Sequence, residues 1–216
     1  MRPTASTADL YKVARRRFGH LRTLIPTAPV PVTQDVDRAT AFVAIELLNL
    51  WAQFSRSLYL ASCRGARGQG GVRISTTVPY VDDNESLRLA TNHVRGRTMA
   101  AGAKITSRDE PNWFDPNTLL RALDHVGASN HGAVGAALSL QGRVLRDLPS
   151  VRNFYGHRAA NTAAKVVGTR GVIQHYAVSR AAHPTVFCLD YEVGRPRPVL
   201  GVWLEDINIL ANYSAS

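Results

Sequence analysis

The sequence predicts an all-α, or mainly α, protein with minor β-hairpin or loop insertions. Apolar residues recur at the 3.6-residue period of a helix over long stretches. Helix start and stop signals flank several of these stretches. Only two segments favour extended backbone, 64–83 and 185–193. At 216 residues, the chain fits one domain.

The first third of the chain contains the most regular apolar patterns. An apolar series from Leu10 to Ile25 predicts a first helix, which the proline-rich segment 26–35 separates from the next element. Residues 35–63 carry the strongest helical signal. A helix that is apolar on several faces is either buried in a core or shared between a core and a partner subunit. Its apolar residues are Phe42, Val43, Ile45, Leu47, Leu50, Trp51, Phe54, Leu58, Leu60 and Ala61.

The middle of the chain predicts a loop and two short helices. The glycine-rich segment 64–83 is typical of a loop or small hairpin. Asn84 is a candidate N-cap for the helix that follows. Asp115 is a natural N-cap for the second helix, Pro116 fits its first position, and Gly127 stands where a C-cap belongs.

Prolines delimit the predicted helices of the last third. The segment 131–148 predicts a helix that Pro149 ends. Ser150 suits the N-cap of a further helix over 151–168, and Pro198 opens a last one.

These elements predict a single domain over residues 1–216. It consists of an N-terminal helix and proline-rich linker (1–34), a core bundle (35–168) and a C-terminal extension with the last helix (169–216).

The charge balance favours a polyanionic partner. The formal net charge is +10, and only 3 of the 26 basic residues are lysine. Arginine suits bidentate contacts to phosphate, although GC-rich coding would produce the same bias. A basic surface of this kind favours nucleic acid as the partner.

Several classes of function are disfavoured. Cys63 and Cys188 lie far apart and form no CxxC pair, which excludes a thiolate zinc site and indicates a reducing compartment. The histidines show no metal-ligand spacing, and no run approaches the roughly 20 apolar residues of a membrane span. We therefore expect a cytoplasmic protein with no metal, no cofactor and no membrane partner.

One short motif carries the functional hypothesis. Asn153 directly follows Arg152, and His157 stands five positions after that arginine. The bare spacing is weak evidence, because this arginine-rich chain repeats it at Arg15/His20, Arg88/His93 and Arg170/His175. Context separates the motif from those pairs. It follows a predicted helix start, where free backbone N–H groups and the helix dipole favour a phosphate.

The segment "LRDLPSVRNFYGHRAANTA", with the apolar stretch "AIELLNLWAQFSRSLYLAS" upstream, resembles the HEPN family of small helical proteins. Many HEPN proteins are metal-independent ribonucleases that act in toxin–antitoxin, anti-phage or RNA-processing systems. Their signature is an arginine, a polar residue directly after it, and a histidine four to six residues beyond the arginine. Arg152, Asn153 and His157 fill those places. Ala159 stands where some toxin members carry a tyrosine.

The resemblance implies a composite site in a homodimer. On an ideal helix, Arg152 and His157 point about 140° apart, so one copy assembles a site poorly unless the helix bends at Gly156. Two copies related by a two-fold axis would bring two arginines and two histidines to one phosphate. There His157 would act as general acid or base on RNA, Arg152 would stabilise the phosphate charge, and Asn153 would orient the phosphate or hold the backbone.

Four further residues are candidates for supporting or RNA-binding roles, each with an ordinary structural alternative. Glu46 could orient His157 or Arg152, or pair with a surface arginine. Arg158 and Arg56 could contact phosphate, or be solvated or ion-paired. Tyr155 is expected to pack, with base stacking as the alternative.

The preferred hypothesis is a HEPN-type endoribonuclease in prokaryotic defence or a toxin–antitoxin pair, with RNA as substrate and an antitoxin or defence-system protein as a possible partner. The main rival is a non-catalytic HEPN-like module that binds RNA or a partner. A third reading is a helical scaffold or DNA-binding protein whose charge coats phosphate.

Overall fold

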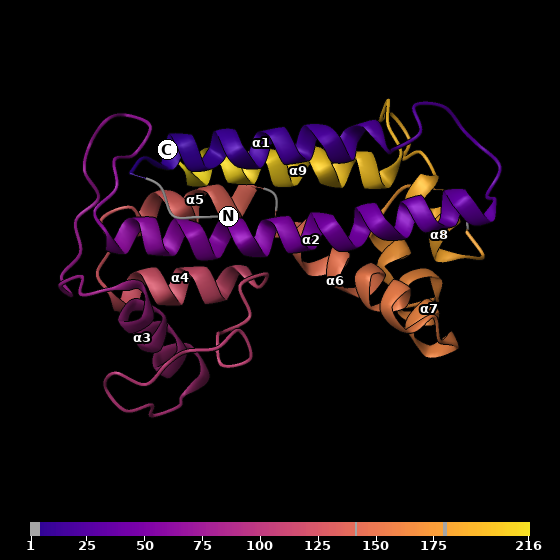
Figure 1. Cartoon of the computed structure of the whole chain (residues 1–216). Coiled ribbons are helices and arrows are strands. Elements are labelled where there is room, and N and C mark those ends of the chain that lie inside the picture. Colours follow the sequence, from indigo (N-terminus) through magenta and orange to yellow (C-terminus); the bar gives the residue numbers. More distant parts are fainter. Residues whose placement is uncertain (1–4, 141, 179–180) are drawn as a thin grey trace. The chain divides into compact units, whose positions relative to one another are not determined.

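The protein is all-α in its computed structural model, which describes residues 5–140, 142–178 and 181–216 (Figure 1). Over these residues there are nine α-helices, one 3₁₀ helix and no strand, and the β contacts are isolated bridges. None of these helices is both long and apolar enough to cross a membrane. The helices are α1 (Thr7–Thr23), α2 (Gln34–Cys63), α3 (Asp83–Arg95), α4 (Pro116–His125), α5 (His131–Leu140), α6 (Gly142–His157), α7 (Ala160–Val167), the 3₁₀ helix η1 (Val172–His175), α8 (Pro184–Leu189) and α9 (Val199–Ser214).

The chain divides into two compact units. The first comprises Met1–Arg15, Leu50–Gly142 and Ile209–Ser216, and the second comprises Arg16–Asn49 and Arg143–Asn208. Helices α1, α2 and α9 each contribute to both units.

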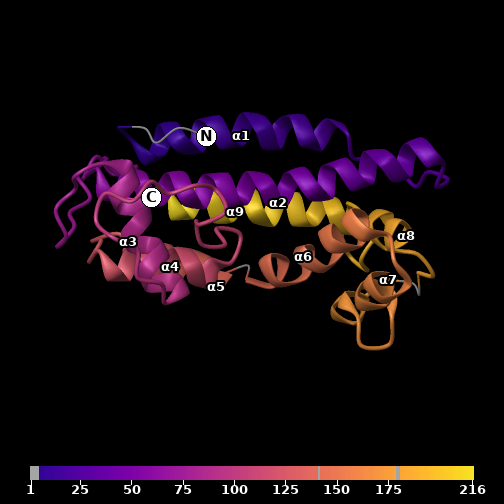
Figure 2. The ribbon, with the colours of Figure 1, turned by 60° about the horizontal axis from the view of Figure 1, so that its bottom comes forward.

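The first unit is built on the second half of α2. Tyr59 is fully buried there, its hydroxyl donates to the Ser86 carbonyl of α3 at 2.7 Å, and its ring lies 5.3 Å from that of Trp113. Helices α3 and α4 lie side by side in both views of the ribbon (Figures 1 and 2). Their apolar faces complete this core with Leu87, Ala90, Leu119, Ala122 and Leu123.

Helix caps in the first unit partly follow the predictions. The predicted start and stop of α4 are confirmed: the Asp115 carboxylate accepts the N–H of Asn117, and Gly127 has φ +60°. For α3 the predicted cap is wrong. Asp82, not Asn84, accepts the N–H of Glu85. Asn84 lies inside the helix, where its amide contacts a loop.

The segment 64–83 is a loop rather than a hairpin. Its β contacts are isolated bridges from Arg67, one to Ser6 and one to Arg73. The loop instead gains rigidity from side chains: the Arg64 guanidinium makes a two-point ion pair with Asp83, at 2.9 and 2.5 Å.

The second unit has an aromatic core. The rings of Tyr176, Phe187 and Trp203 lie 5.5–5.9 Å apart in edge-to-face arrangements. The Trp203 indole N–H donates to the Tyr176 hydroxyl at 2.7 Å, so its polar group is satisfied within the core. Edge-to-face rings add stabilisation beyond their buried area.

Several predicted boundaries in the last third of the chain are wrong. Helix α6 passes through Pro149 and ends at His157, so Pro149 does not stop a helix and Ser150 does not cap one. The predicted helix 131–148 is instead divided between α5 and α6, with Gln141 outside the described residues. The predicted extended segment 185–193 contains helix α8, which Pro184 opens.

The multi-faced apolar helix is α2, and its apolar side chains are mostly buried within the chain. Trp51 and Leu60 are fully buried in the first unit. Phe42 is the exception in the second unit, where its side chain is 49% exposed. Burial in the core therefore accounts for most of the apolar pattern.

Replacement of Pro149 should stabilise the protein. In the interior of α6 the proline supplies no N–H to the Leu145 carbonyl and crowds that turn. We expect Pro149→Ala to raise the free energy of unfolding by about 2 kcal/mol, after allowance for the freer unfolded chain. Urea unfolding followed by circular dichroism measures the change. The control is Pro116→Ala, at the first position of α4, which should leave the stability unchanged or lower it. Equal destabilisation by both changes would contradict the expectation.

Candidate functional site

The motif residues lie on one exposed face of α6. Taking Arg152 as reference, an ideal helix places Gly156, Asn153 and His157 about 40°, 100° and 140° around the axis. All four are exposed, whereas the intervening Phe154 and Tyr155 are buried. The spacing therefore gathers the motif onto one solvent-facing arc.

The centre of this arc is open. A Cβ atom added at Gly156 would meet no neighbouring atom within 4 Å. The glycine thus leaves the backbone accessible between the side chains of Arg152 and His157. A ligand could approach the helix there.

The motif lies at the end of a helix, which corrects the predicted position at a helix start. Helix α6 ends at His157, Arg158 adopts a left-handed φ of +46°, and α7 begins at Ala160. The last turn of a helix carries unpaired carbonyls and partial negative charge. The expected attraction of a phosphate to free backbone N–H groups therefore does not operate at Arg152.

Arg152 and His157 do not contact each other. The Arg152 guanidinium makes one long hydrogen bond, 3.4 Å, to the Asn153 amide oxygen. In the described part of the chain no carboxylate lies within 4.0 Å of Arg152. The positive charge of Arg152 is consequently available to a ligand, but one copy of the chain does not close a site around it.

The inner side of the same turn is fixed by Asp37 of α2. Arg158 donates to one Asp37 oxygen at 2.6 Å, and the Thr185 hydroxyl of α8 donates to the other. The Tyr155 hydroxyl donates to Thr185 at 3.0 Å, which extends the chain of hydrogen bonds into α6. The Asp37 carboxylate of α2 therefore binds α8 directly and the residue that follows α6.

The surroundings of Asp37 keep its carboxylate ionised. The Asp37 side chain is only 16% exposed. Burial acts to raise the pKa of Asp37, but the hydrogen bonds from Thr185 and Arg158 outweigh it and hold that pKa below its ordinary value. Asp37 is therefore charged at neutral pH, which keeps Arg158 in place.

Helix α8 supplies the third side of this junction. The His183 ring caps it by accepting the N–H of Thr185 at 3.2 Å, and it packs edge-on against Phe154 at 5.4 Å. Sequence reasoning missed Asp37 and Thr185. The signals were an aspartate in the first turn of the long apolar helix and a histidine–proline pair at a helix start.

The other candidate residues have structural partners. Tyr155 is 6% exposed, so its ring packs inward and is not open to a base. Arg158 pairs with Asp37. Glu46 contacts Asn49 at 3.1 Å and Arg17 at 4.0 Å, rather than Arg152 or His157. Arg56 makes a two-point ion pair with Glu110, at 2.6 and 3.0 Å, in the first unit.

A different histidine has the most developed polar environment. The His175 Nδ1 atom lies 3.0 and 3.1 Å from the oxygens of Asp147, whose side chain is only 2% exposed. The Tyr176 hydroxyl donates to the same carboxylate at 3.0 Å, and burial, followed by the charge of Asp147, raises the pKa of Tyr176. The Arg170/His175 spacing, one of the three pairs set aside in the sequence, thus includes a histidine held by a buried acid.

Comparisons of the chain with protein-family models, with curated proteins and with solved structures found no match. Across the described ranges, no three His, Cys, Asp or Glu side chains gather closely enough to hold a metal ion.

Removal of the Asp37 charge should loosen the end of α6. We expect Asp37→Asn to lower the free energy of unfolding at neutral pH by about 2 kcal/mol, because hydrogen bonds to a charged group are lost. The folded state holds the pKa of Asp37 below its unfolded value, so this stabilisation is present at neutral pH. It is lost as the pH falls below about 4.

Urea unfolding at several pH values measures this difference. Asp35→Asn is a matched control in the same first turn of α2, because that side chain is 93% exposed. It should change the stability by less than about 0.5 kcal/mol. A gap between wild type and Asp37→Asn that persists unchanged into acid would refute the role of the charge.

Proposed function

We propose that the chain is a metal-independent endoribonuclease in which two copies bring Arg152 and His157 to one RNA phosphate. One observation carries the proposal: Arg152, Asn153, Gly156 and His157 form an exposed arc on α6 that no carboxylate neutralises within the described residues. The net charge of +10 and the motif's resemblance to the HEPN signature support it.

The chemistry requires only side chains and the ribose. A neutral His157 would accept the proton of the 2′-hydroxyl while that oxygen attacks the phosphorus. The bond from phosphorus to the 5′-oxygen would break, and a protonated His157 of the second copy would donate a proton to that oxygen. Arg152 would stabilise the charge that develops on the phosphate. The products would be a 2′,3′-cyclic phosphate and a free 5′-hydroxyl.

A second copy is part of the proposal because one arc does not enclose a phosphate. Arg152 and His157 diverge by about 140° around the helix, and they share no hydrogen bond. A two-fold axis that passes near Gly156 would place the arginine of one arc beside the histidine of the other. The open surface at that glycine leaves room for such an approach.

A non-catalytic HEPN-like module that binds RNA or a protein is the second candidate. The observation that favours it is the position of the motif in the last two turns of α6, since the carbonyls at a helix end repel a phosphate. A role in prokaryotic toxin–antitoxin or anti-phage systems, with an antitoxin or defence partner, follows from the HEPN resemblance alone.

The decisive experiment incubates the purified chain with labelled RNA in the presence of EDTA. We expect cleavage that survives the chelator and leaves 2′,3′-cyclic ends. Arg152→Ala and His157→Ala should each lower the rate by roughly a hundredfold or more. Arg146→Ala, an exposed arginine on the same helix but outside the motif, is the matched control and should retain activity.

The outcomes separate the candidates. Uncut RNA that binds the wild type and both variants equally would favour the binding module. Equal binding of RNA and DNA without cleavage would favour a charged scaffold. DNA of the same sequence should remain intact under the proposed mechanism, because it lacks the 2′-hydroxyl.

Mixed dimers test the composite site. Co-expressed Arg152→Ala and His157→Ala chains should regain part of the activity that each lacks alone, because one intact arginine and one intact histidine can meet in the mixed dimer. Absence of recovery in an isolated mixed dimer would show that each chain works alone.

A further inference from the structure

The segment 95–108 of the first unit, here called the basic loop, has an unusual composition. Its 14 residues include Arg95, Arg97, Lys104 and Arg108 but no aspartate or glutamate. Most of its other residues are glycine, alanine, serine or threonine. Such a segment has little apolar surface of its own to fold around.

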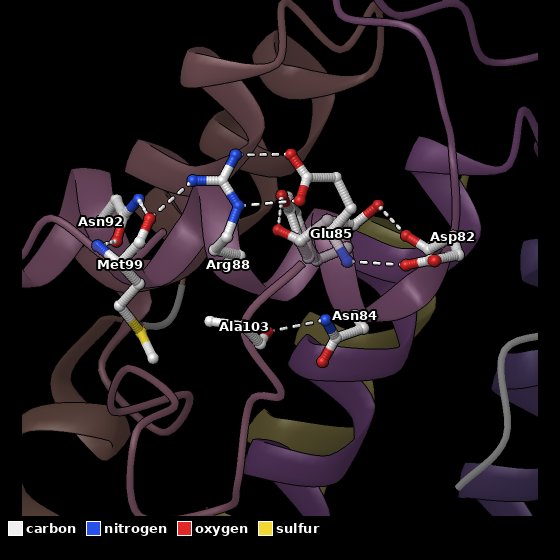
Figure 3. Close-up of polar contacts among 9 residues, drawn as sticks. Asp82, Asn84, Glu85, Arg88, Asn92, Met99 and Ala103 are labelled. Atoms are coloured by element: carbon white, nitrogen blue, oxygen red, sulfur yellow. Dashed lines mark hydrogen bonds and ion pairs between the residues drawn. The ribbon is translucent and has the colours of Figure 1, made fainter. Parts of the chain in front are cut away.

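Polar side chains of α3 nevertheless fix its backbone (Figure 3). The Asn92 amide bonds both the N–H and the carbonyl of Met99, at 2.9 and 3.4 Å. The Asn84 amide donates to the Ala103 carbonyl and accepts the Ile105 N–H, both at 2.8 Å. Each asparagine side chain thus bonds one backbone N–H and one backbone carbonyl of the loop, as a neighbouring β-strand would. The loop is therefore held at two points.

Arg88 holds the basic loop at a third point, and Glu85 neutralises its charge. Its guanidinium makes a two-point ion pair with Glu85, at 2.7 and 2.5 Å, and donates to the Met99 carbonyl at 3.0 Å (Figure 3). The hydrogen bonds from Arg88 hold the pKa of Glu85 below its usual value, so this pair is fully charged and neutral in sum. Arg88 therefore positions the loop without adding to its net charge.

The cations of the basic loop lack comparable partners. Over the residues that the structure describes, Arg95, Lys104 and Arg108 have no carboxylate within 4.0 Å. Arg95 donates to the Arg108 carbonyl at 2.9 Å, a neutral group that orients the guanidinium without cancelling its charge. Arg97 is 3.9 Å from Asp109, whose carboxylate is already held by Thr106.

Helix α4 extends this cationic surface and adds flat rings. Arg121 donates to the His93 carbonyl at 3.0 Å and likewise has no carboxylate within 4.0 Å in the described ranges. The rings of His93 and His125 stack at 4.3 Å, 12° from parallel, and both residues are exposed. Stacked aromatic rings beside arginine suit the bases and phosphates of a single strand.

We infer that the basic loop, with Arg121 and the stacked His93 and His125, is a docking surface for the phosphate backbone of single-stranded RNA. Cations that the fold already holds in place lose little entropy when they bind a polyanion. The surface lies in the first unit, whereas Arg152 and His157 lie in the second. The inference deepens the proposed function by assigning substrate binding to residues outside the motif, and its choice of RNA rests on that proposal.

The test measures binding without cleavage. Labelled oligouridylate is titrated into the full-length chain that carries His157→Ala, over a series of salt concentrations. In that background, Arg95→Gln, Lys104→Gln and Arg108→Gln are combined. Loss of three phosphate contacts should make the slope of log affinity against log salt shallower by about 2, and weaken binding at about 0.1 M salt by roughly thirty- to a hundredfold.

Two further variants locate the effect. Arg15→Gln, Arg16→Gln and Arg170→Gln together remove the same charge from exposed positions elsewhere and should weaken binding by less than about threefold. Asn84→Ala keeps every cation but releases the loop, so it should weaken binding several-fold with the salt slope nearly unchanged. Circular dichroism and thermal unfolding confirm that each variant is folded.

The result bears separately on the two proposals. Equal weakening by the two charge-matched triple variants, or a basic-loop variant that binds as tightly as its parent, would overturn the docking surface. Binding through the loop by a chain that never cleaves RNA would support the surface and refute only the nuclease. In an active chain, the basic-loop variant should raise KM with kcat unchanged.

Discussion

The Asp37 carboxylate of α2 binds α8 and the residue that follows α6, segments that are far apart in the sequence, and it does so with little exposure to water. A buried carboxylate must be matched by donors, and Arg158 and Thr185 supply them. The ion pair also offsets the cost of a positive φ at Arg158, a conformation that residues other than glycine rarely adopt. Because Arg158 directly follows His157, its ion pair with Asp37 helps to fix the turn that follows the exposed arc.

Sequence reasoning predicted those elements whose signals are local. The start and end of α4 depend on Asp115 and Gly127, which act within one turn of their own helix. The predicted helix boundaries are wrong where tertiary contacts outweigh the local preference of a residue for helix or loop. Proline disfavours a helix interior, yet α6 continues through Pro149 because its neighbours Leu148 and Val151 are fully buried. Helix α8 has only six residues, too few for a periodic pattern.

The candidate site was predictable to the same extent. The exposure of Arg152 and His157 follows from a helical period that turns Phe154 and Tyr155 inward, and the sequence contains that period. The partners of Glu46, Arg56 and Arg158 do not follow from it. Arg56 meets Glu110 across 54 positions and Arg158 meets Asp37 across 121, so only the folded chain reveals them. The HEPN resemblance is specific only in the short motif Arg152, Asn153 and His157, so it assigns no role to Asp37.

The net charge is +10, and the positions of the acidic residues determine which cations are neutralised within the fold. Carboxylates form two-point pairs with Arg56, Arg64 and Arg88, arginines that hold helices and loops together in the first unit. Asp37 does the same for Arg158 in the second. Several acidic residues are therefore paired with arginines that connect separate segments of the chain. Among the described residues, Arg152 of the motif arc and Arg95, Lys104 and Arg108 of the basic loop have no carboxylate within 4.0 Å, and exposed arginines elsewhere, such as Arg15 and Arg170, share this property. These cations keep their charge for a polyanionic ligand, and the geometry around them, rather than the charge alone, distinguishes the two surfaces.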